Sequence, residues 1–372
     1  METGFNMQAV TNPLETQART RAQRWSGFLP GVLLTGAIAI LANELSKSAW
    51  MQAHGISALT LAIVIGMIAG NTFYPRIAGV SGRGVAFSKQ TLLRAGIILY
   101  GLRLTFQDIG RVGMVGVMVD AIVLSSTFAL SWWAGTRLFG LNRRTAMLIG
   151  AGSSICGAAA VMATEPVVRG RAEEVSIAVA TVVAFGTLAI FIYPALYHLN
   201  DRLHWVSITP FAYGIFTGST VHEVAQVVAA GKAVAETTAN TAVITKLVRV
   251  MMLAPFLVLL SAYLSRNSEE GATPAVKTGP HPWRGVIPWF ALGFIAVAGF
   301  NSLALLPRAV VSTAIDADTL ILATAMAALG VSTHIPAIRK AGVKPLALAA
   351  LLFGWLIFGG FAINIGISAL FA

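Results

Sequence analysis

Eleven apolar stretches, each long enough to cross a lipid bilayer as a helix, constrain this chain more than any other feature. A helix needs about 20 apolar residues to span the hydrocarbon core. Of the 372 residues, 56% are hydrophobic and 11% are charged, and the mean hydropathy is +0.76. The stretches are 27–45, 55–74, 88–107, 112–136, 144–164, 172–198, 208–231, 237–263, 286–304, 317–338 and 346–371. We therefore expect an all-α polytopic membrane protein with about eleven transmembrane helices.

The Lys and Arg residues outside these stretches predict how the chain is oriented. Sixteen lie in connections on the side of the N-terminus, and seven lie on the opposite side. Because cytoplasmic connections carry the excess of positive charge, this bias predicts a cytoplasmic N-terminus and a C-terminus outside. Residues 1–26 are polar and lack a cleavage signal, so we expect a cytoplasmic tail ahead of one transmembrane domain, 27–372.

Charge and cysteine content exclude several classes of protein. The net charge of +11 resides mainly in short connections, where it acts as a topology signal, and we expect no nucleic-acid partner. Cys156 is the single cysteine, so no intrachain disulfide can form.

Two apolar stretches are interrupted near their middles by glycine, hydroxyl and proline residues. They read GAGSSICG at 150–157 and GVSTHIP at 330–336. Backbone groups freed inside a bilayer must face protein or a watery cavity, and matching breaks in two halves are typical of a transporter's substrate site. We expect paired half-helices near the midplane, whose amide ends favour an anion. Close packing of small residues is the alternative.

Apart from its first helix, the chain divides into two inverted repeats of five helices, about 55–198 and 208–371. Leu92-Leu93-Arg94 resembles Leu247-Val248-Arg249, and the first break resembles the second. Since five is odd, corresponding helices would cross the membrane in opposite senses.

Residues at the breaks and intramembrane cations are the candidate substrate-binding groups. Lys246 and Arg249 are three residues apart on one predicted helix face and suggest a cationic patch, with charge compensation of Glu223 or Asp120 as the alternative. Hydroxyl groups can replace part of an oxyanion's hydration shell. The candidates are Gly152, Ser153, Ser154, Cys156, Ser219, Thr220, Ser332, Thr333, His334, Lys246 and Arg249.

His222 and Glu223, in the polar run 214–226, are the candidates for ion coupling. Histidine titrates near physiological pH, which favours proton handling. Adjacent residues on a straight helix point about a quarter-turn apart, so a metal site shared by these two is not expected. An internal ion pair with Lys246 is the alternative. We expect neither a metal nor a cofactor.

Five segments together resemble a family of bacterial inner-membrane proteins named as sulfate exporters. They are LLRAGIILYGLRL at 92–104, GAGSSICGAAA at 150–160, TGSTVHEVAQV at 217–227, ANTAVITKLVRVMMLAP at 239–255 and GVSTHIPAIRK at 330–340. The resemblance runs from about residue 27 to the C-terminus. It implies the fold of sodium/proton antiporters and bile-acid symporters, with a core domain of two crossed broken helices and a panel domain that often forms a homodimer.

These observations predict a secondary transporter of a small anion such as sulfate. A proton- or sodium-coupled carrier of organic anions is the alternative. A membrane-embedded enzyme, with Ser153 or Ser154 as nucleophile, is a remote third reading, because the sequence has no nucleophile elbow, no HExxH motif and no phosphate loop. We do not expect an enzyme.

Overall fold

Every element in the described part of the chain is a helix. The computed structural model describes residues 28–48, 50–51, 56–266 and 289–371. Six helices there are long and apolar enough to cross a bilayer. They are α2 (Leu29–Ser46), α7 (Phe106–Trp133) with its extension η3 (Ala134–Leu138), α10 (Ala172–Leu203), α13 (Glu236–Met251) continued by α14 (Leu253–Arg266), α16 (Arg308–Val331) and α18 (Val343–Leu370). The all-α polytopic prediction is confirmed.

Shorter helices fill the remaining apolar stretches. They are α4 (Ala58–Asn71), α6 (Leu93–Tyr100) between the π-helix η1 (Ser88–Leu92) and the 3-10 helix η2 (Gly101–Arg103), and α15 (Trp289–Ser302). One further helix, α5 (Tyr74–Phe87), forms where the sequence predicted a polar connection. It packs against α2, with the rings of Phe28 and Phe87 4.8 Å apart, and leaves Arg76 and Arg83 exposed.

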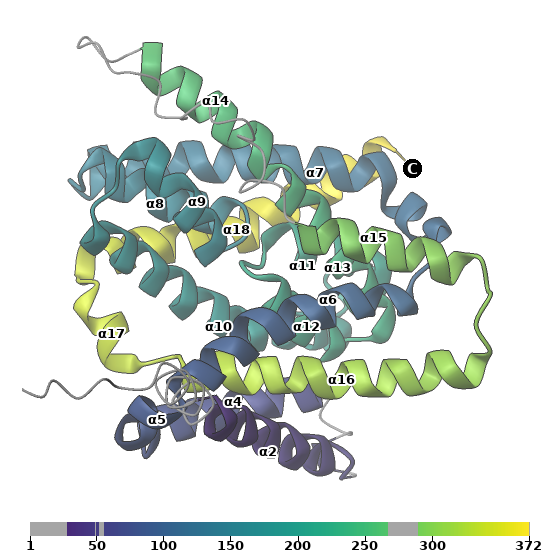
Figure 1. The fold of residues 1–372 in the computed structure, drawn as a ribbon. Coiled ribbons are helices and arrows are strands. Elements are labelled where there is room, and N and C mark those ends of the chain that lie inside the picture. The colour runs from purple at the N-terminus through teal and green to yellow at the C-terminus, as the bar shows by residue number, and fades with distance from the viewer. Residues whose placement is uncertain (1–27, 49, 52–55, 267–288, 372) are drawn as a thin grey trace, which may run out of the picture.

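Residues 143–168 fold back as a hairpin instead of crossing the membrane. Helix α8 (Arg143–Ser154) runs inward and α9 (Ala158–Val168) returns beside it (Figure 1). Asn142, ahead of α8, donates to Glu174 Oε1, beyond α9, at 2.7 Å. A Cβ atom on Gly152 would lie 2.8 Å from the side chain of Val161. Both ends of this hairpin 1 therefore lie on one face of the protein, called side A.

Residues 210–232 form a second hairpin that enters from the opposite face, side B. Helix α11 (Pro210–Thr220) runs parallel to α13, since Thr238 donates to Pro210 O at 2.9 Å at the start and Gly218 packs against Ala242 further along. Helix α12 (Val224–Lys232) runs back, and Gly231 lies against Ala239 near the start of α13. Because α10 connects the two hairpins across the membrane, hairpin 2 enters from side B.

The break predicted at 330–336 does not interrupt a membrane helix. Helix α16 ends at Val331, and a short helix, α17 (Ile335–Lys340), follows on side A. Asn71 at the end of α4 donates to Thr333 O at 2.9 Å and accepts from Ile335 N at 3.0 Å. A Cβ atom on Gly330 would collide with the backbone of α4. The small residues here serve close helix packing and helix termination, so the alternative of packing holds for this motif.

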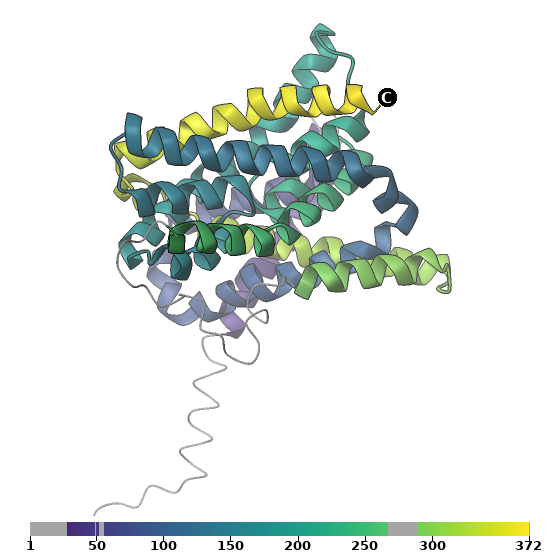
Figure 2. The ribbon, with the colours of Figure 1, turned by 90° about the horizontal axis from the view of Figure 1, so that it is seen from above.

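The helices form two groups with few contacts between them. Helices α2, α4, α5, α6, α15 and α16 make up the scaffold group, and helices α7 to α13 and α18 make up the hairpin group. Figure 1 shows the scaffold helices α2, α4 and α16 below the hairpin group, and Figure 2 shows α7 and α18 side by side.

The two hairpins have equivalent neighbours in the hairpin group. Helix α8 packs on α7 and α10, whereas α11 packs on α18 and α13. Hairpin 1 therefore corresponds to hairpin 2, and the superposition of the first break on residues 330–336 is wrong. The predicted halves 55–198 and 208–371 each hold one hairpin, but their helices follow in a different order.

Candidate functional site

The tips of the two hairpins meet inside the protein. Tip 1 comprises residues 153–157 and tip 2 comprises residues 219–223, and neither is helical throughout. Helix α8 has 12 residues and α11 has 11. At 1.5 Å per residue, each tip lies roughly 17 Å from the start of its hairpin, about halfway through a hydrocarbon core of about 30 Å.

Lys246 of α13 joins the two tips. Its ammonium group donates to Ile155 O of tip 1 and, at 2.7 Å, to Val221 O of tip 2. The side chain is fully buried. Since an ammonium group carries three donors, one N–H remains.

Arg249, one turn further along α13, joins the tips a second time. Its Nε donates to Ser154 O at 2.6 Å, its second terminal nitrogen donates to Ser153 O at 2.9 Å, and the first donates to Ser219 O. This side chain is also fully buried. A guanidinium group has five donors, so two N–H groups remain.

The unpaired carbonyls at the ends of α8 and α11 explain why two cations lie here. The last carbonyls of α8 and α11 have no partner within their own helices and together carry partial negative charge. In lipid, such groups must be satisfied by protein. Lys246 and Arg249 donate to these carbonyls. In many transporters a coupling cation binds carbonyls of this kind instead. The two cations thus hold the negative ends of both half-helices.

The positive ends of the two returning half-helices face a carboxylate. Glu223, at the start of α12, accepts from Ala158 N, the first amide of α9, at 3.3 Å. It is half-buried, whereas the adjacent His222 is buried. No ion pair joins Glu223 and Lys246 among the described residues. Glu223 therefore occupies the position that helix dipoles prepare for an anion.

Several buried polar atoms around the tips have no hydrogen-bond partner in the described chain. Asp120 of α7 is fully buried with both carboxylate oxygens unpaired, and Arg249 and Lys246 are the charged groups that act on it. The others near the tips are Ser154 Oγ, Thr217 Oγ1, His222 Nδ1, Gln226 Nε2 and Asn364 Oδ1. A buried polar atom without a hydrogen bond costs free energy, so this cluster of atoms indicates a binding place for water or a polar ligand.

The structure brings together most of the predicted site residues. Ser153, Ser154 and Cys156 lie in tip 1, and Gly152 of α8 directly precedes it. Ser219, Thr220, His222 and Glu223 lie in tip 2. Lys246 and Arg249 bind backbone carbonyls at the tips and do not form an open cationic patch.

Ser332, Thr333 and His334 lie elsewhere. Ser332 and Thr333 donate to Ala328 O and Leu329 O of their own helix, and His334 stacks on Tyr74 with ring centroids 6.3 Å apart. Their assignment to the same site as tip 1 is wrong, because they form the contact between α16, α4 and α5.

Asn364 was missed by sequence reasoning. Its Nδ2 donates to Ser219 Oγ of tip 2 at 3.1 Å and to Gly360 O of its own helix at 2.8 Å. A lone amide in the apolar stretch 346–371 was the signal that marks it.

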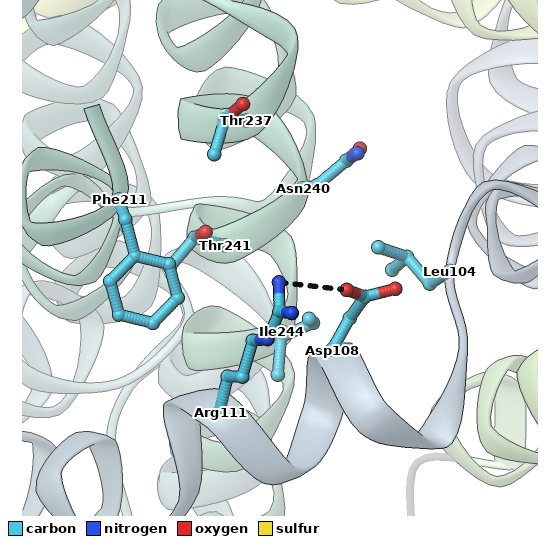
Figure 3. A pocket seen from close by; sticks show the side chains of 8 residues that line it. All are labelled: Leu104, Asp108, Arg111, Phe211, Thr237, Asn240, Thr241 and Ile244. Carbon is cyan, nitrogen blue, oxygen red and sulfur yellow. Dashed lines mark ion pairs between the residues drawn. The ribbon is translucent and has the colours of Figure 1, made fainter.

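On side B, a cavity of about 200 Å³ lies beside hairpin 2 (Figure 3). The starts of α7, α11 and α13 enclose it, through Asp108, Phe211 and Thr237 respectively. Arg111 stands over the cavity with its guanidinium 3.9 Å from Asp108 Oδ1.

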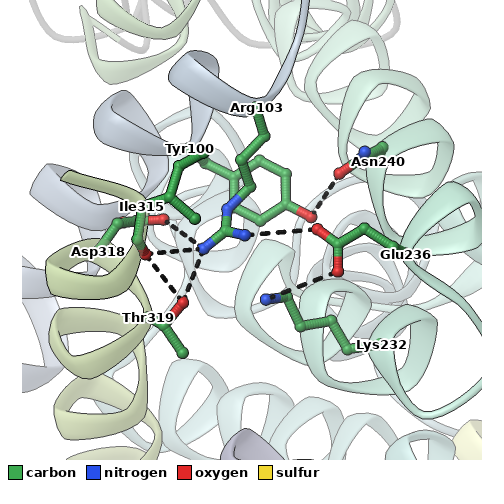
Figure 4. A network of polar contacts seen from close by, with 8 residues as sticks. All are labelled: Tyr100, Arg103, Lys232, Glu236, Asn240, Ile315, Asp318 and Thr319. Carbon is green, nitrogen blue, oxygen red and sulfur yellow. Dashed lines mark hydrogen bonds and ion pairs between the residues drawn. The ribbon is translucent and has the colours of Figure 1, made fainter. Parts of the chain in front are cut away.

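A polar network next to this cavity connects the scaffold and hairpin groups (Figure 4). Arg103 donates to Ile315 O at 3.0 Å and Thr319 Oγ1 at 2.7 Å, and it pairs with Asp318 at 3.5 Å and Glu236 at 3.4 Å. Glu236 belongs to α13, so the network crosses from one helix group to the other.

Comparison with known proteins gives the same picture of a membrane protein. Residues 30–349 match the family described as "Conserved hypothetical protein 698". A UPF0324 membrane protein of Pseudomonas aeruginosa is 60% identical over 350 residues, covering 94% of this chain and 97% of the relative. A UPF0324 membrane protein of Yersinia pestis is 56% identical, covering 91% and 92%. The UPF0324 inner membrane protein YeiH of Escherichia coli K12 is 54% identical, covering 93% and 96%. No solved structure matches.

Proposed function

The chain belongs to the family described as "Conserved hypothetical protein 698", and from this membership and the tip geometry we propose that it is a secondary transporter of a small anion. The observation that carries the proposal is the meeting of two hairpin tips, entered from opposite sides and joined by Lys246 and Arg249. Non-helical backbone at membrane depth is tolerated where it lines a pathway or is buried in protein, and transporters place their substrate there.

Sulfate, or an anion of its class, suits the groups at the tips. The unused N–H groups of Lys246 and Arg249, the unpaired hydroxyl of Ser154 and the first amide of α12 are all donors. Moving one charge through 100 mV is worth about 2.3 kcal/mol, so a dianion leaving a negative-inside cell gains roughly twice that. Export by this route needs no coupling ion.

Radioactive sulfate flux into proteoliposomes tests the proposal. We expect Lys246→Met to reduce flux to the rate of empty vesicles, because the tips lose a cation and both carbonyl contacts. Lys344→Met, the same change at an exposed position on side A, is the matched control and should keep wild-type flux. Equal flux in both variants would overturn the assignment of the site.

Independence from sodium follows from the same contacts. An ammonium group already binds the tip carbonyls that would otherwise coordinate Na⁺. Flux should therefore be unchanged when choline replaces sodium on both sides of the vesicle. A strict sodium requirement would contradict this role for Lys246.

A proton-coupled carrier of organic anions is the second candidate. It is favoured by His222, which is buried beside the tips with Nδ1 unpaired, and by the half-buried Glu223. In that case His222→Gln would abolish the dependence of flux on a pH gradient, whereas the first proposal predicts flux driven by voltage alone.

We also propose that the chain is not an enzyme. The serine residues of tip 1 use their backbone carbonyls to bind Arg249, which is a structural use of these positions. A fluorophosphonate probe should therefore leave Ser153 and Ser154 unlabelled, and a covalent adduct on either serine would support catalysis.

A further inference from the structure

The cavity on side B has the electrostatics of an anion site. Three helices begin at its wall: α7 at Phe106, α11 at Pro210 and α13 at Glu236. A helix N-terminus carries about half a positive charge from unpaired N–H groups. Three such ends converge here, with one amide of α7 capped by Thr105 and one of α11 capped by Thr209. The guanidinium of Arg111 offsets the carboxylate of Asp108 on the same wall.

Neutral donors on the α13 wall point to the same ligand class. Thr241 lines the cavity although it is only 4% exposed. Asn240 accepts a hydrogen bond at Oδ1 from the Tyr100 hydroxyl at 2.9 Å. The NH₂ group of the same amide carries two hydrogen-bond donors, and the Asn240 side chain lines the cavity (Figure 3).

The carboxylate on the cavity wall is already in use. Asp108 Oδ2 accepts from Thr105 N at 3.0 Å and from Thr105 Oγ1 at 2.8 Å, which caps the start of α7. Its other oxygen lies 3.9 Å from Arg111. A cation site would need several free oxygen ligands, whereas the available groups here are mainly donors.

From these contacts we propose that the side B cavity binds a small tetrahedral oxyanion on its way to the hairpin tips. The inference that the cavity lies on the transport path rests on the proposed function, whereas the inference that it binds an oxyanion does not. Its volume of about 200 Å³ leaves room for one such ion with water. Thr241 and Ile244 precede Lys246 on α13, so an ion in the cavity lies within two turns of the tips along that helix.

Protection of an engineered cysteine from labelling tests the site directly. The background is Cys156→Ala, which removes the single native thiol. Thr237→Cys places a thiol on the cavity wall, and Thr313→Cys places one on an exposed turn of α16 near side B as the matched control. A membrane-impermeant maleimide is applied to proteoliposomes in sodium sulfate or in sodium chloride of equal ionic strength.

Sulfate should slow labelling at Thr237→Cys and leave Thr313→Cys unchanged. At about three times the dissociation constant, a bound ligand lowers the free fraction about fourfold, which sets the expected change in rate. Adding Arg111→Gln, or Thr241→Val where the first variant fails to fold, should abolish the protection. Equal labelling in both salts at Thr237→Cys, or equal protection at Thr313→Cys, would overturn the cavity site.

Lys246→Met separates this inference from the function on which its transport role rests. Protection that persists in Lys246→Met while flux is lost supports two distinct sites. Protection that persists while flux never depended on Lys246 supports the cavity and refutes the tip site. Loss of protection in Lys246→Met shows that the probe reported the tips and refutes a separate cavity site.

Discussion

Arg249 is the residue whose chemical identity the tips depend on most. Three of its nitrogens bind carbonyls of two different chain reversals, Ser153 and Ser154 on one side and Ser219 on the other. A guanidinium presents fixed, divergent donors, whereas an ammonium is a compact point charge. The pair on α13 is therefore not interchangeable, although both residues are cations.

Arg249→Lys should destabilise the protein and abolish transport. An ammonium cannot reach all three carbonyls, and losing two charge-assisted bonds to buried groups costs about 3 kcal/mol or more. Thermal unfolding in detergent measures the loss. Arg266→Lys, at an exposed position, is the control and should change stability little. Similar unfolding temperatures for the two variants would refute the bridging role.

Gly157 is the second residue that the tips require. Its φ of +72° lies in the region that favours glycine, and a Cβ atom there would lie 2.5 Å from Glu223 Cγ. Any side chain at position 157 would therefore strain the backbone of tip 1 and clash with tip 2.

Gly157→Ala should lower stability by about 1–3 kcal/mol from backbone strain alone, with a further loss where Glu223 cannot move away. Flux should fall in the same variant. Gly36→Ala in α2 is the matched control, since that position is helical and has open space around it. If the two alanine variants unfold at the same temperature, tip 1 does not need glycine.

At the scale of single elements, a hairpin and a broken span look alike in sequence. Hairpin 1 has the length and apolarity of one transmembrane helix, so the stretch 144–164 predicted a helix with a break but not its reversal. A hairpin differs from a broken span because its two ends lie close together, as the hydrogen bond from Asn142 to Glu174 shows here. Apolar periodicity records burial in lipid and carries no such information.

Labelling from one side of the membrane separates hairpin from span. Arg144→Cys lies in the first turn of hairpin 1 and Arg171→Cys follows the hairpin, and both positions are exposed. In the Cys156→Ala background, both should react with an impermeant maleimide added from the same side, whereas His204→Cys beyond α10 should react from the other. Opposite sidedness for Arg144→Cys and Arg171→Cys would restore the crossing helix.

The first tip and the α13 cations were predictable because polar groups inside apolar stretches are costly and rarely incidental. The partner tip was assigned to residues 330–336 because glycine and hydroxyl residues serve two purposes. At Gly330 they let α16 approach α4 closely, as at Gly66, where a Cβ atom would meet Ala327 O. Composition is the same in both cases, and only the three-dimensional neighbours distinguish them.

For the whole molecule, the hairpins change the count of charges on each side. Both ends of hairpin 1 lie on side A, so Arg169 and Arg171 join the cytoplasmic side predicted from charge. Arg202, at the end of α10, moves to side B. The net effect strengthens the positive bias of side A.

The C-terminus should therefore lie outside the cytoplasm. Helix α18 begins on side A and ends at Leu370 on side B. Alkaline phosphatase fused to the C-terminus should be active, and a green fluorescent protein fused at the same position should be dark. The reverse result would invert the whole molecule without changing its internal contacts.

Few contacts connect the scaffold and hairpin groups, so any sliding between them is resisted chiefly by specific polar ties. Arg103 is such a tie on side B (Figure 4). Its partners differ in environment: the Asp318 side chain is fully buried within the scaffold group, whereas the Glu236 side chain of the hairpin group is 56% exposed. The same guanidinium thus stabilises one helix group internally and holds the second group to it.

Arg103→Gln should destabilise the protein far more than Glu236→Gln. Removing the arginine leaves Asp318 as a buried charge without its ion-pair partner, which typically costs 3–5 kcal/mol, whereas an exposed pair is worth about 0.2–1 kcal/mol. Thermal unfolding of both single variants and of Arg103→Gln/Asp318→Asn measures the difference. The double variant should regain much of the lost stability, because the unpaired carboxylate is gone.

Glu236→Gln, by loosening only the tie between the groups, should leave stability close to that of the wild type and raise the flux rate if the groups slide during transport. Equal destabilisation by the two single variants would mean that the network acts as one unit and does not divide into a buried support and an exposed tie.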